Sequence, residues 1–417
     1  MSNAATTVGA APRIGGVASP WISPALALGI GLAVAPAAGV LQSKALAPIA
    51  VLALALCVLR HRQRHGAWPW PQGAVAATSL ALFAWGAASA LWALEPAKAF
   101  GTAVQIGGFV LLGAGAARAV AEDDDAARRS LMRLAAAGLV AGLLLAALDH
   151  LTGNAVRAAV RGRQEVPPPL HFGLKPAGSA MALWLPLVAA APGLPRVRRG
   201  VVLAGGAAVL LLLPGETPKI AVAAAAAAGG AALLAPRLAP RLLGVVLAAA
   251  ILLMPAILGP VLARGVPADG IAPSAAQRLL IWDFAATRIA ERPLLGWGME
   301  ASRAVPGHDG NPSPEALARF GIAYPFAARW ELLPLHPHNG ALQLWLELGA
   351  PGAVLGAALA VLLGLAAARA ARPAVAAAVL AAGSVTAMLS FGAWQEWWVG
   401  AELMAAAAVA GIPRRQG

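Results

Sequence analysis

Long apolar segments recur along the whole chain, and they constrain its fold more than any other feature of the sequence. They are rich in alanine and leucine and run for about 17 to 25 residues, which suits helices crossing a hydrocarbon core about 30 Å thick rather than barrel strands. Hydrophobic residues make up 59% of the 417 positions and charged residues only 12%, far below the roughly 25% typical of soluble domains. The sequence therefore predicts an all-α, polytopic membrane bundle.

The apolar pattern predicts about twelve transmembrane helices. One long polar segment, residues 263–338, interrupts it and predicts a large, mainly helical extramembrane loop, in which Ser274 is expected to cap a helix that ends near Arg292. The chain thus divides into residues 1–262 with nine spans and short loops, the loop at 263–338, and residues 339–417 with three spans and a short tail. The spans are expected at 22–41, 45–60, 73–94, 99–119, 131–151, 171–192, 200–214, 219–235, 241–262, 339–368, 373–394 and 398–412.

Arginine clusters in alternate loops predict the orientation of the bundle. By the positive-inside rule their side is the cytoplasm, so both termini, including a short tail before residue 21, are expected there and the large loop outside. The net charge of +13 does not indicate nucleic acid, because the charges lie mostly between apolar segments. The clusters are Arg60, Arg62 and Arg64; Arg118, Arg128, Arg129 and Arg133; Arg196, Arg198 and Arg199; Arg237 and Arg241; Arg369 and Arg372; and Arg414 and Arg415.

Two further features exclude simple alternatives. The acidic run at residues 122–125 resembles a metal site only superficially, because it lies in a predicted cytoplasmic loop beside Arg128 and Arg129, and we expect a solvated charge cluster there. The single Cys57 sits in an apolar segment and excludes an internal disulfide framework.

The stretch from Leu335 to Gly349 places two histidines and an asparagine where the long polar segment meets an apolar one. Ionisable groups at membrane depth are costly and indicate function. Histidine, with a reference pKa of about 6.5, also suits a general base near neutrality. We therefore predict His338 as the catalytic base, with His336, Asn339 and Glu347 in supporting positions.

Several Lys and Arg residues lie on the predicted outer side, where the positive-inside rule disfavours them, so their presence requires an explanation. One interpretation is that their side chains extend to lipid phosphates; the other is a site for an anion. The candidates for an anion clamp are Arg161, Arg163, Lys219, Arg278 and Arg288.

One base and several fixed cations, without a recognisable metal or nucleotide motif, fit a reaction whose leaving group is a stable anion. A lipid-linked diphosphate is such a group, because fixed cations stabilise the charge that develops on its oxygen as a glycosidic bond breaks. A single base without a second suitable carboxylate also predicts inversion at the anomeric carbon, by analogy with glycosidases.

Two motifs resemble those of the O-antigen ligase and polymerase superfamily. His338-Asn339 is followed by Gln343, then by Glu347-x-Gly349 and Gly352. The second motif lies upstream: Arg278-x-x-x-Trp282, continuing to residues 292–298, resembles the segment that precedes the histidine in these proteins. The twelve predicted spans and the large loop also resemble the architecture of this superfamily.

This resemblance implies a metal-independent glycosyltransferase without cofactors in the bacterial inner membrane, acting at the periplasmic face in lipopolysaccharide biosynthesis. Its donor would be undecaprenyl-diphosphate-linked polysaccharide and its acceptor lipid A-core, with His338 matching the family's essential histidine and Arg278 its arginine before the tryptophan. Lys219 departs from the family, which has an arginine there. It keeps the charge but loses the bidentate fork.

The sequence leaves other functions open. O-antigen polymerases and protein O-oligosaccharyltransferases share these motifs, and we favour the ligase because the sequence given ends just after its last span. A lipid-linked glycan transporter or flippase belongs to a different class, and would be expected to carry charges near the bilayer midplane.

Overall fold

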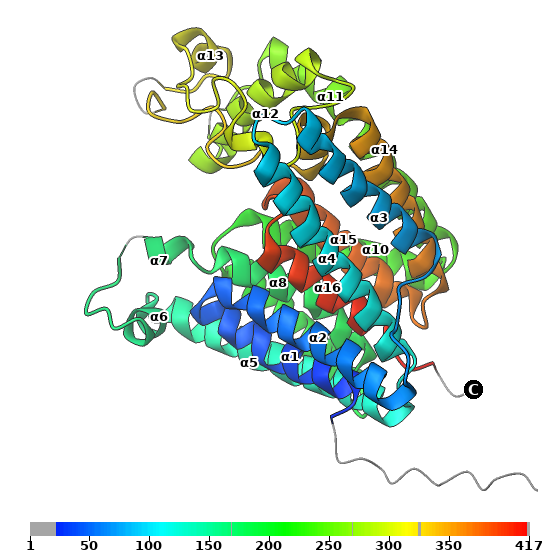
Figure 1. Ribbon diagram of the computed structural model, residues 1–417. Coiled ribbons are helices and arrows are strands. Elements are labelled where there is room, and N and C mark those ends of the chain that lie inside the picture. Colours follow the sequence, from blue (N-terminus) through cyan, green and yellow to red (C-terminus); the bar gives the residue numbers. More distant parts are fainter. Residues whose placement is uncertain (1–21, 168, 269, 324–326, 415–417) are drawn as a thin grey trace, which may run out of the picture.

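The computed structural model describes residues 22–167, 169–268, 270–323 and 327–414, and within these ranges all regular structure is helical (Figure 1). The predicted all-α membrane bundle is confirmed, whereas the expected N-terminal tail lies outside the described residues. The helices are α1 (Pro24–Leu41), η1 (Ser43–Ala45), α2 (Leu46–His65), α3 (Gly73–Ala88), η2 (Ser89–Leu91), α4 (Pro96–Ala121), α5 (Asp125–Leu151), α6 (Ala155–Val160), α7 (Pro169–Phe172), α8 (Lys175–Trp184), η3 (Leu185–Ala190), α9 (Arg196–Leu212), α10 (Glu216–Leu234), α11 (Leu238–Arg264), α12 (Pro273–Glu291), η4 (Ala301–Arg303), α13 (Pro314–Arg319), α14 (Gly340–Arg369), α15 (Pro373–Leu389) and α16 (Glu396–Ala410).

Eight helical segments of the described residues are long and apolar enough to cross a membrane. They are α1, η1 with α2, α3 with η2, α4, α5, α10, α11 and α14. The shorter helices α8 with η3, α9, α15 and α16 overlap the other four predicted spans. Every predicted span therefore coincides with helix.

Small residues let the helices approach closely. Gly138 and Gly142, one turn apart on α5, face α1, where added Cβ atoms would lie 2.4 Å from Ala33 Cα and 2.4 Å from Pro36 Cβ. On α11, a Cβ at Gly244 would lie 2.8 Å from the carbonyl oxygen of Ala360 on α14. Such contacts hold membrane helices together by close packing, since lipid supplies no hydrophobic drive between them.

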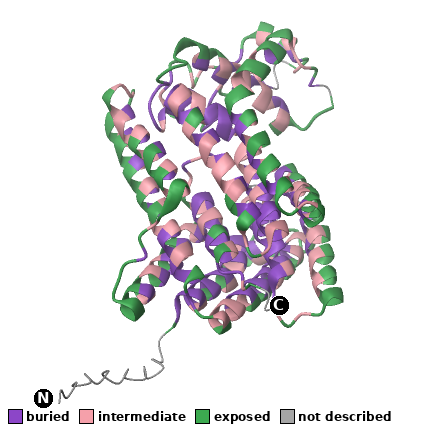
Figure 2. Ribbon diagram, turned by 90° about the vertical axis from the view of Figure 1, so that its right-hand side faces the viewer, coloured by how far each residue is buried: buried purple, intermediate pink, exposed green. Residues whose placement is uncertain are grey.

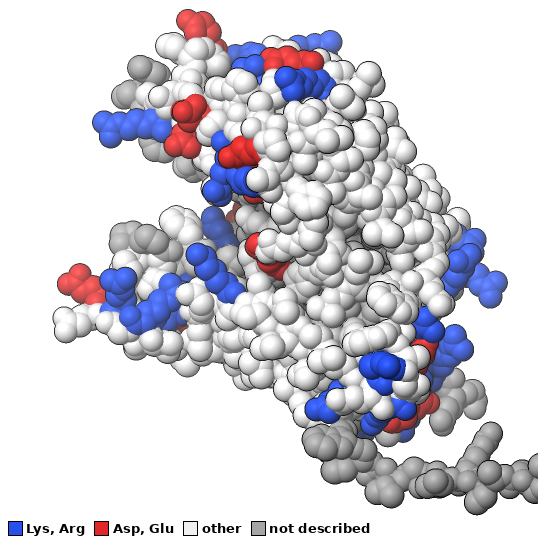
Figure 3. All heavy atoms as spheres, in the orientation of Figure 1, with Lys and Arg blue, Asp and Glu red and all other residues white. Residues whose placement is uncertain are grey.

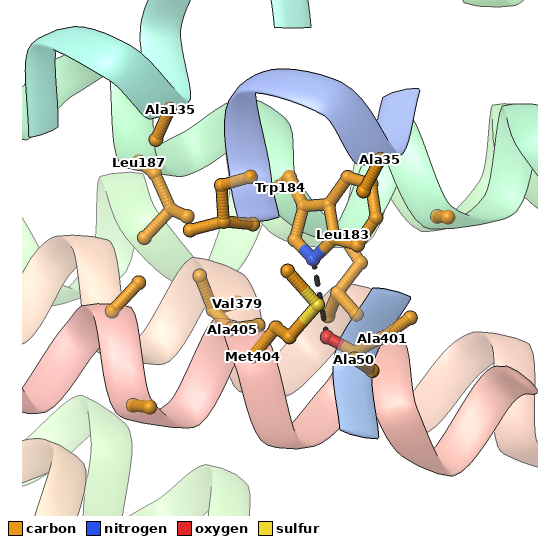
Figure 4. Close-up of a cluster of buried hydrophobic side chains, with 14 of the residues drawn as sticks. Ala35, Ala50, Ala135, Leu183, Trp184, Leu187, Val379, Ala401, Met404 and Ala405 are labelled. Carbon is orange, nitrogen blue, oxygen red and sulfur yellow. Dashed lines mark hydrogen bonds between the residues drawn. The ribbon is translucent and has the colours of Figure 1, made fainter. Parts of the chain in front are cut away.

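The centre of the bundle is packed around Trp184 at the end of α8. Its side chain is 2% exposed, and its indole Nε1 donates to the carbonyl oxygen of Ala401 on α16 at 3.1 Å (Figure 4). Met404 and Leu187 lie beside it in the same apolar cluster. Buried residues face neighbouring helices and exposed ones face outward (Figure 2), as expected for a bundle whose outer surface contacts lipid.

The arginine-rich loops meet at one end of the bundle, away from α12 and α13. Asp123 is 8% exposed; its carboxylate accepts from the backbone N–H of Ala25 and from Arg64, both at 2.8 Å. The prediction of a fully solvated acidic cluster is therefore wrong for Asp123. It ties the start of α1 to the end of α2, while Asp124 caps α5.

The large segment after α11 is less helical than expected. Its helices are α12, η4 and α13, and loops with Pro306, Gly307 and Pro312 join them, because proline and glycine oppose helix continuation. The predicted cap is also wrong, since Ala272 precedes α12 and makes no side-chain cap, and Ser274 lies inside the helix. The segment nevertheless contributes to two apolar clusters, one around Phe284 that it shares with α14 and one around Phe320 that it shares with α11.

The segment between α5 and α8 is anchored by a buried ion pair. Arg157 and Asp149 are both fully buried, with Nε to Oδ2 at 2.6 Å, and Arg157 also donates to the carbonyl oxygen of Leu170 at 2.7 Å. Arg157 therefore holds α6 and α7 against α5. The molecular surface is hollowed between this segment and α12 with α13, and charged side chains lie along the hollow (Figure 3).

Candidate active site

The His-Pro-His turn at residues 336–338 is held from two directions. The indole Nε1 of Trp282, on α12, donates to the carbonyl oxygen of Pro337 at 2.8 Å. Within the turn, the backbone N–H of His338 donates to Nδ1 of His336 at 3.1 Å, and the two ring centroids lie 4.2 Å apart. His338 has a positive φ of 53°, which is strained for a residue with a Cβ and is often found at functional sites. The turn is thus fixed in a conformation that its sequence alone does not favour.

The hydrogen bond made by the imidazole of His338 determines its tautomer. Nδ1 lies 2.5 Å from the backbone carbonyl oxygen of Ser390, just after α15. A carbonyl oxygen only accepts, so Nδ1 carries the proton and Nε2 of the neutral ring keeps a free lone pair. Burial lowers the pKa of His338 and the charge of Arg278 lowers it further, against the effect of the Ser390 carbonyl. His338 therefore presents a neutral, basic nitrogen at neutral pH.

His336 plays a different part. Burial, together with the charges of His338, Arg303 and Arg278, lowers its pKa to about 3, and its Nδ1 accepts the His338 N–H. Its ring also packs against the backbone of Gly392, where a Cβ would lie 3.0 Å from the imidazole carbon Cδ2. His336 stays neutral and supports the turn.

Arg278 on α12 and Arg303 in η4 lie within electrostatic range of the histidine pair, and Lys175 at the start of α8 lies within range of Arg278. Arg278 is half-buried and lies within electrostatic range of His338, His336 and Lys175. Lys175 packs on the turn before α10, since a Cβ at Gly215 would lie 2.9 Å from its Cγ. In the first turn of α10, Lys219 Nζ lies 3.0 Å from Glu216 Oε1. The structure thus brings Arg278 to the histidines, while Lys175 and Lys219 both interact with Glu216.

The other three predicted cations have different neighbours. Arg288 pairs with Glu291 at 2.6 Å, and its guanidinium carbon lies 5.0 Å from the ring centroid of Phe284. Arg161 donates to the carbonyl oxygen of Leu41 at 2.8 Å, and Arg163 is exposed. The helix before these last two, α6, lies across the hollow from α12 (Figures 1 and 3). Contacts with the histidines are absent among the described partners of these three side chains, and their role as donor ligands stays a prediction.

Glu347 is the hub of a buried hydrogen-bond network behind the histidines. The fully buried carboxylate accepts from the hydroxyl of Ser302 at 2.5 Å, the indole of Trp394 at 2.6 Å, the backbone N–H of Glu300 at 2.7 Å and the amide of Gln343 at 3.1 Å. Four donors are enough to hold a buried carboxylate in the interior. Glu347 therefore joins α14, the large segment and the loop before α16.

A cavity of about 230 Å³ lies between this network and His336. Its walls combine carboxylates and amides with one guanidinium, so its lining is mainly polar. Burial raises the pKa of Glu300, while Lys98 and Arg303 oppose that change. The lining residues are Thr102, Gln105, Ile106, Glu300, Ser302, Arg303, Leu335, His336, Gln343, Glu347, Gly392, Trp394, Gln395 and Glu396.

The motif residues on α14 shape the start of this helix. Asn339 is its N-cap, and its side chain accepts from the N–H of Leu342 at 3.1 Å, which satisfies one of the free donors of the first turn. The helix then breaks at Gly349, where φ is 63°. A Cβ at Gly349 would lie 2.3 Å from the carbonyl oxygen of Leu294, so only glycine fits.

Residues 293–298 fill the break. The backbone N–H groups of Trp297 and Gly298 donate to the carbonyls of Leu346 and Glu347, both at 2.9 Å, and Ala350 donates back to Pro293 at 2.9 Å. The backbone groups freed by the break are thus paired inside the protein, as membrane depth requires. This contact explains why the two predicted motifs occur together.

Several residues at the site carry no signal in the sequence. Ser390 acts through a backbone carbonyl, which any residue supplies, and Arg303 and Trp394 reach the cavity only through the fold. Lys175 is visible beforehand only as one more outer cation. Proximity in space, without a motif, makes these residues part of the site.

Comparison with known proteins agrees with this geometry. Residues 198–357, which include Arg278, His338 and Glu347, match the family model described as O-Antigen ligase. Over these residues the chain is similar to O-antigen ligases. The resemblance predicted from the two motifs is therefore confirmed.

Curated relatives are similar to this chain over a shorter stretch. The Rickettsia conorii protein named "Putative polysaccharide ligase RC0486" is 43% identical over 83 residues, 20% of this chain and 18% of the relative. A Rickettsia bellii protein named "Putative polysaccharide ligase" is 40% identical over 106 residues, 25% of this chain and 24% of the relative. The matches thus span about a quarter of these relatives or less. No solved structure matches the chain.

Proposed function

We propose that this protein transfers a preassembled O-antigen polysaccharide from undecaprenyl diphosphate to a sugar hydroxyl of lipid A-core. The observation that carries the proposal is the state of His338: its Nδ1 donates to Ser390, so its Nε2 is free to accept a proton. Arg278 lies beside it as a fixed positive charge. A base next to a cation is what attack by a hydroxyl and departure of a diphosphate require.

In the proposed reaction Nε2 of His338 takes the proton of the acceptor hydroxyl as its oxygen bonds to the anomeric carbon. The bond from that carbon to the diphosphate breaks, and the diphosphate leaves with the electron pair. Arg278, Lys175 and Lys219 stabilise the negative charge that develops, more in the transition state than in the ground state. The Ser390 carbonyl stabilises the imidazolium through Nδ1. With one base and direct displacement, the product has the inverted anomeric configuration.

The charges around the turn support separate places for the two substrates. Arg278 and Lys175 lie within electrostatic range of each other, whereas the cavity is lined by Glu300, Glu347 and Glu396 with Arg303 as its one guanidinium. The paired cations attract a diphosphate more strongly than the cavity does, because its carboxylates outnumber its guanidinium. The polar cavity suits sugar hydroxyls, which hydrogen-bond to carboxylates and amides.

The proposed setting is the bacterial inner membrane, with the site at the periplasmic face and both termini in the cytoplasm. The arginine-rich loops at the opposite end of the bundle support this orientation, since such loops face the cytoplasm. Lipid-linked donor and lipid A-core would then reach the site from the outer leaflet.

Purified protein in detergent, mixed with both lipids, tests the proposal. The wild type should form polysaccharide-linked lipid A-core, and His338→Ala should lose about 10² to 10⁴-fold in rate while still binding the donor. His65→Ala changes an exposed histidine at the other end of the bundle and should leave the rate unchanged. A transporter forms no product without compartments, and a polymerase lengthens the donor without the acceptor; either result, or an active His338→Ala, contradicts the proposal.

A further inference from the structure

An apolar groove lies between η3, α9, α10 and α15, far from the histidine turn. Its volume is about 630 Å³, within the range of roughly 300–1,000 Å³ for pockets that bind small ligands. The groove follows the late part of α10, from Val222 to Leu233, and the start of α15. These are the ends opposite Lys219 and Ser390, so the groove opens at the arginine-rich end of the bundle.

Two arginines close the polar end of the groove. Arg199 on α9 and Arg372 before α15 both line it, and both donate to the carbonyl oxygen of Ala189, at 3.5 and 2.7 Å. The Nε of Arg199 is buried and has no hydrogen-bond partner among the described residues. One shared carbonyl thus holds two guanidinium groups side by side at the mouth.

The segments that build the groove supply no negative charge to this mouth. Residues 166–215, 217–268 and 348–395 contain no Asp or Glu, yet they contribute several arginines to this end of the bundle. Positive charges that gather on segments without acidic residues favour a bound anion. The arginines are Arg196, Arg198, Arg199, Arg237, Arg241, Arg369 and Arg372.

We propose that the groove binds an anionic glycerophospholipid, with an acyl chain along α10 and α15 and the phosphate between Arg199 and Arg372. The walls beyond the arginines are alanines, prolines, glycine and branched aliphatic residues, which suit a hydrocarbon chain. Arginine is the better partner for the phosphate because its planar fork binds two oxygens. Basic pockets between membrane helices at the cytoplasmic side are expected to take such headgroups.

The preference of the groove for an anionic headgroup is tested by native mass spectrometry of the delipidated protein with added phosphatidylglycerol or phosphatidylcholine. Phosphatidylglycerol should stay bound to the wild type at least tenfold more than phosphatidylcholine. The double variant Arg199→Gln/Arg372→Gln should lose this preference. The matched control Arg196→Gln/Arg198→Gln changes two exposed arginines outside the groove and should keep it. Equal retention of the two lipids by the wild type overturns the proposal.

The position is tested by filling the groove. Ala226 is exposed and lines it, whereas Ala227, also exposed, does not. Ala226→Phe should reduce phosphatidylglycerol binding at least tenfold and Ala227→Phe should not, with both variants unfolding at the wild-type temperature. Unchanged binding in Ala226→Phe overturns the site. Loss of lipid in Ala226→Phe but not in the arginine double variant overturns the anionic headgroup in favour of a neutral chain.

Discussion

Nδ1 of His338 lies 2.5 Å from the backbone carbonyl oxygen of Ser390, and this contact joins the candidate base to the end of α15. The contact leaves Nε2 as the nitrogen that can accept a proton. Its acceptor is a backbone carbonyl, so substitution of the Ser390 side chain does not remove it. The geometry leads to five predictions about the proposed reaction and the fold around it.

The pH dependence of ligation should reflect the lowered pKa of His338. A base must be neutral to act, so the rate falls as the pH falls through the pKa of the folded protein. Because burial and Arg278 hold this pKa below 6.5, the acid limb of kcat/KM should have its midpoint below pH 6.5. A midpoint at or above 6.5 would show that the ring is not the desolvated base described here.

Arg278→Gln should weaken catalysis and also shift that acid limb. Removing the nearby positive charge lets the pKa of His338 rise, so the midpoint should move to higher pH while the rate at neutral pH falls. Arg288→Gln, which removes a guanidinium paired with Glu291, serves as the control and should leave the midpoint in place. A lower rate with an unmoved midpoint would mean that Arg278 does not act on the histidine.

Trp282→Phe should lower kcat by about tenfold to a hundredfold and leave KM unchanged. Misplacement of a catalytic group, here His338, has effects of this size. The variant keeps an aromatic ring but loses the hydrogen bond to Pro337. Steady-state kinetics measure the change. Trp68→Phe, at an exposed position, is the comparison, and equal kcat in the two variants would argue against a positioning role for Trp282.

Glu347→Gln should destabilise the protein by at least about 1–3 kcal/mol, because the new amide NH₂ faces donors that previously found a carboxylate oxygen and leaves buried groups unsatisfied. Four donors converge on this side chain. Thermal unfolding in detergent gives the measurement. The exposed Glu331→Gln should unfold as the wild type does; so would Glu347→Gln if the network contributed nothing.

Gly349→Ala should lower both stability and activity. With φ 63° and ψ −160°, the backbone of Gly349 lies in a region that is essentially limited to glycine and costs about 1–3 kcal/mol for a residue with a Cβ, and the added atom meets the Leu294 carbonyl. Gly101→Ala adds a methyl group where no atom lies within 4 Å and should be neutral or stabilising. Comparison of the two melting temperatures checks the prediction, which fails if they are equal.

Much of the fold follows from the sequence because membrane spans are read from length and hydropathy, which are local properties. Asn339 and Glu347 could be singled out for the same reason, since each stands beside the histidine in one short motif. The break at Gly349 could not be foreseen, because it depends on backbone contacts with residues 293–298, far away in the chain. Likewise the buried state of Asp123 arises from α1, with which it shares no local pattern.

The site was predictable to the extent that its residues sit in motifs. Arg278 and Trp282 are one helical turn apart, so both reach the turn at residues 336–338. The positive charge of Arg278 acts on His338, and the indole of Trp282 donates a hydrogen bond to Pro337. Arg161 and Arg288 show the opposite case. Both are cations in segments where the sequence predicts an anion site, but they donate hydrogen bonds to Leu41 and Glu291 and not to the histidine turn.

The pairing of residues 293–298 with the interrupted helix restricts how the outer segment can move. If this strip, residues 293–298, detached, the carbonyls of Leu346 and Glu347 would lose their hydrogen bonds at membrane depth. Each unpaired carbonyl would cost several kcal/mol. We therefore expect any opening motion to hinge beyond residue 298, leaving the strip seated. The lipid-borne substrates would then enter laterally, through the hollow facing α6, and not from under a lid lifted off the bundle.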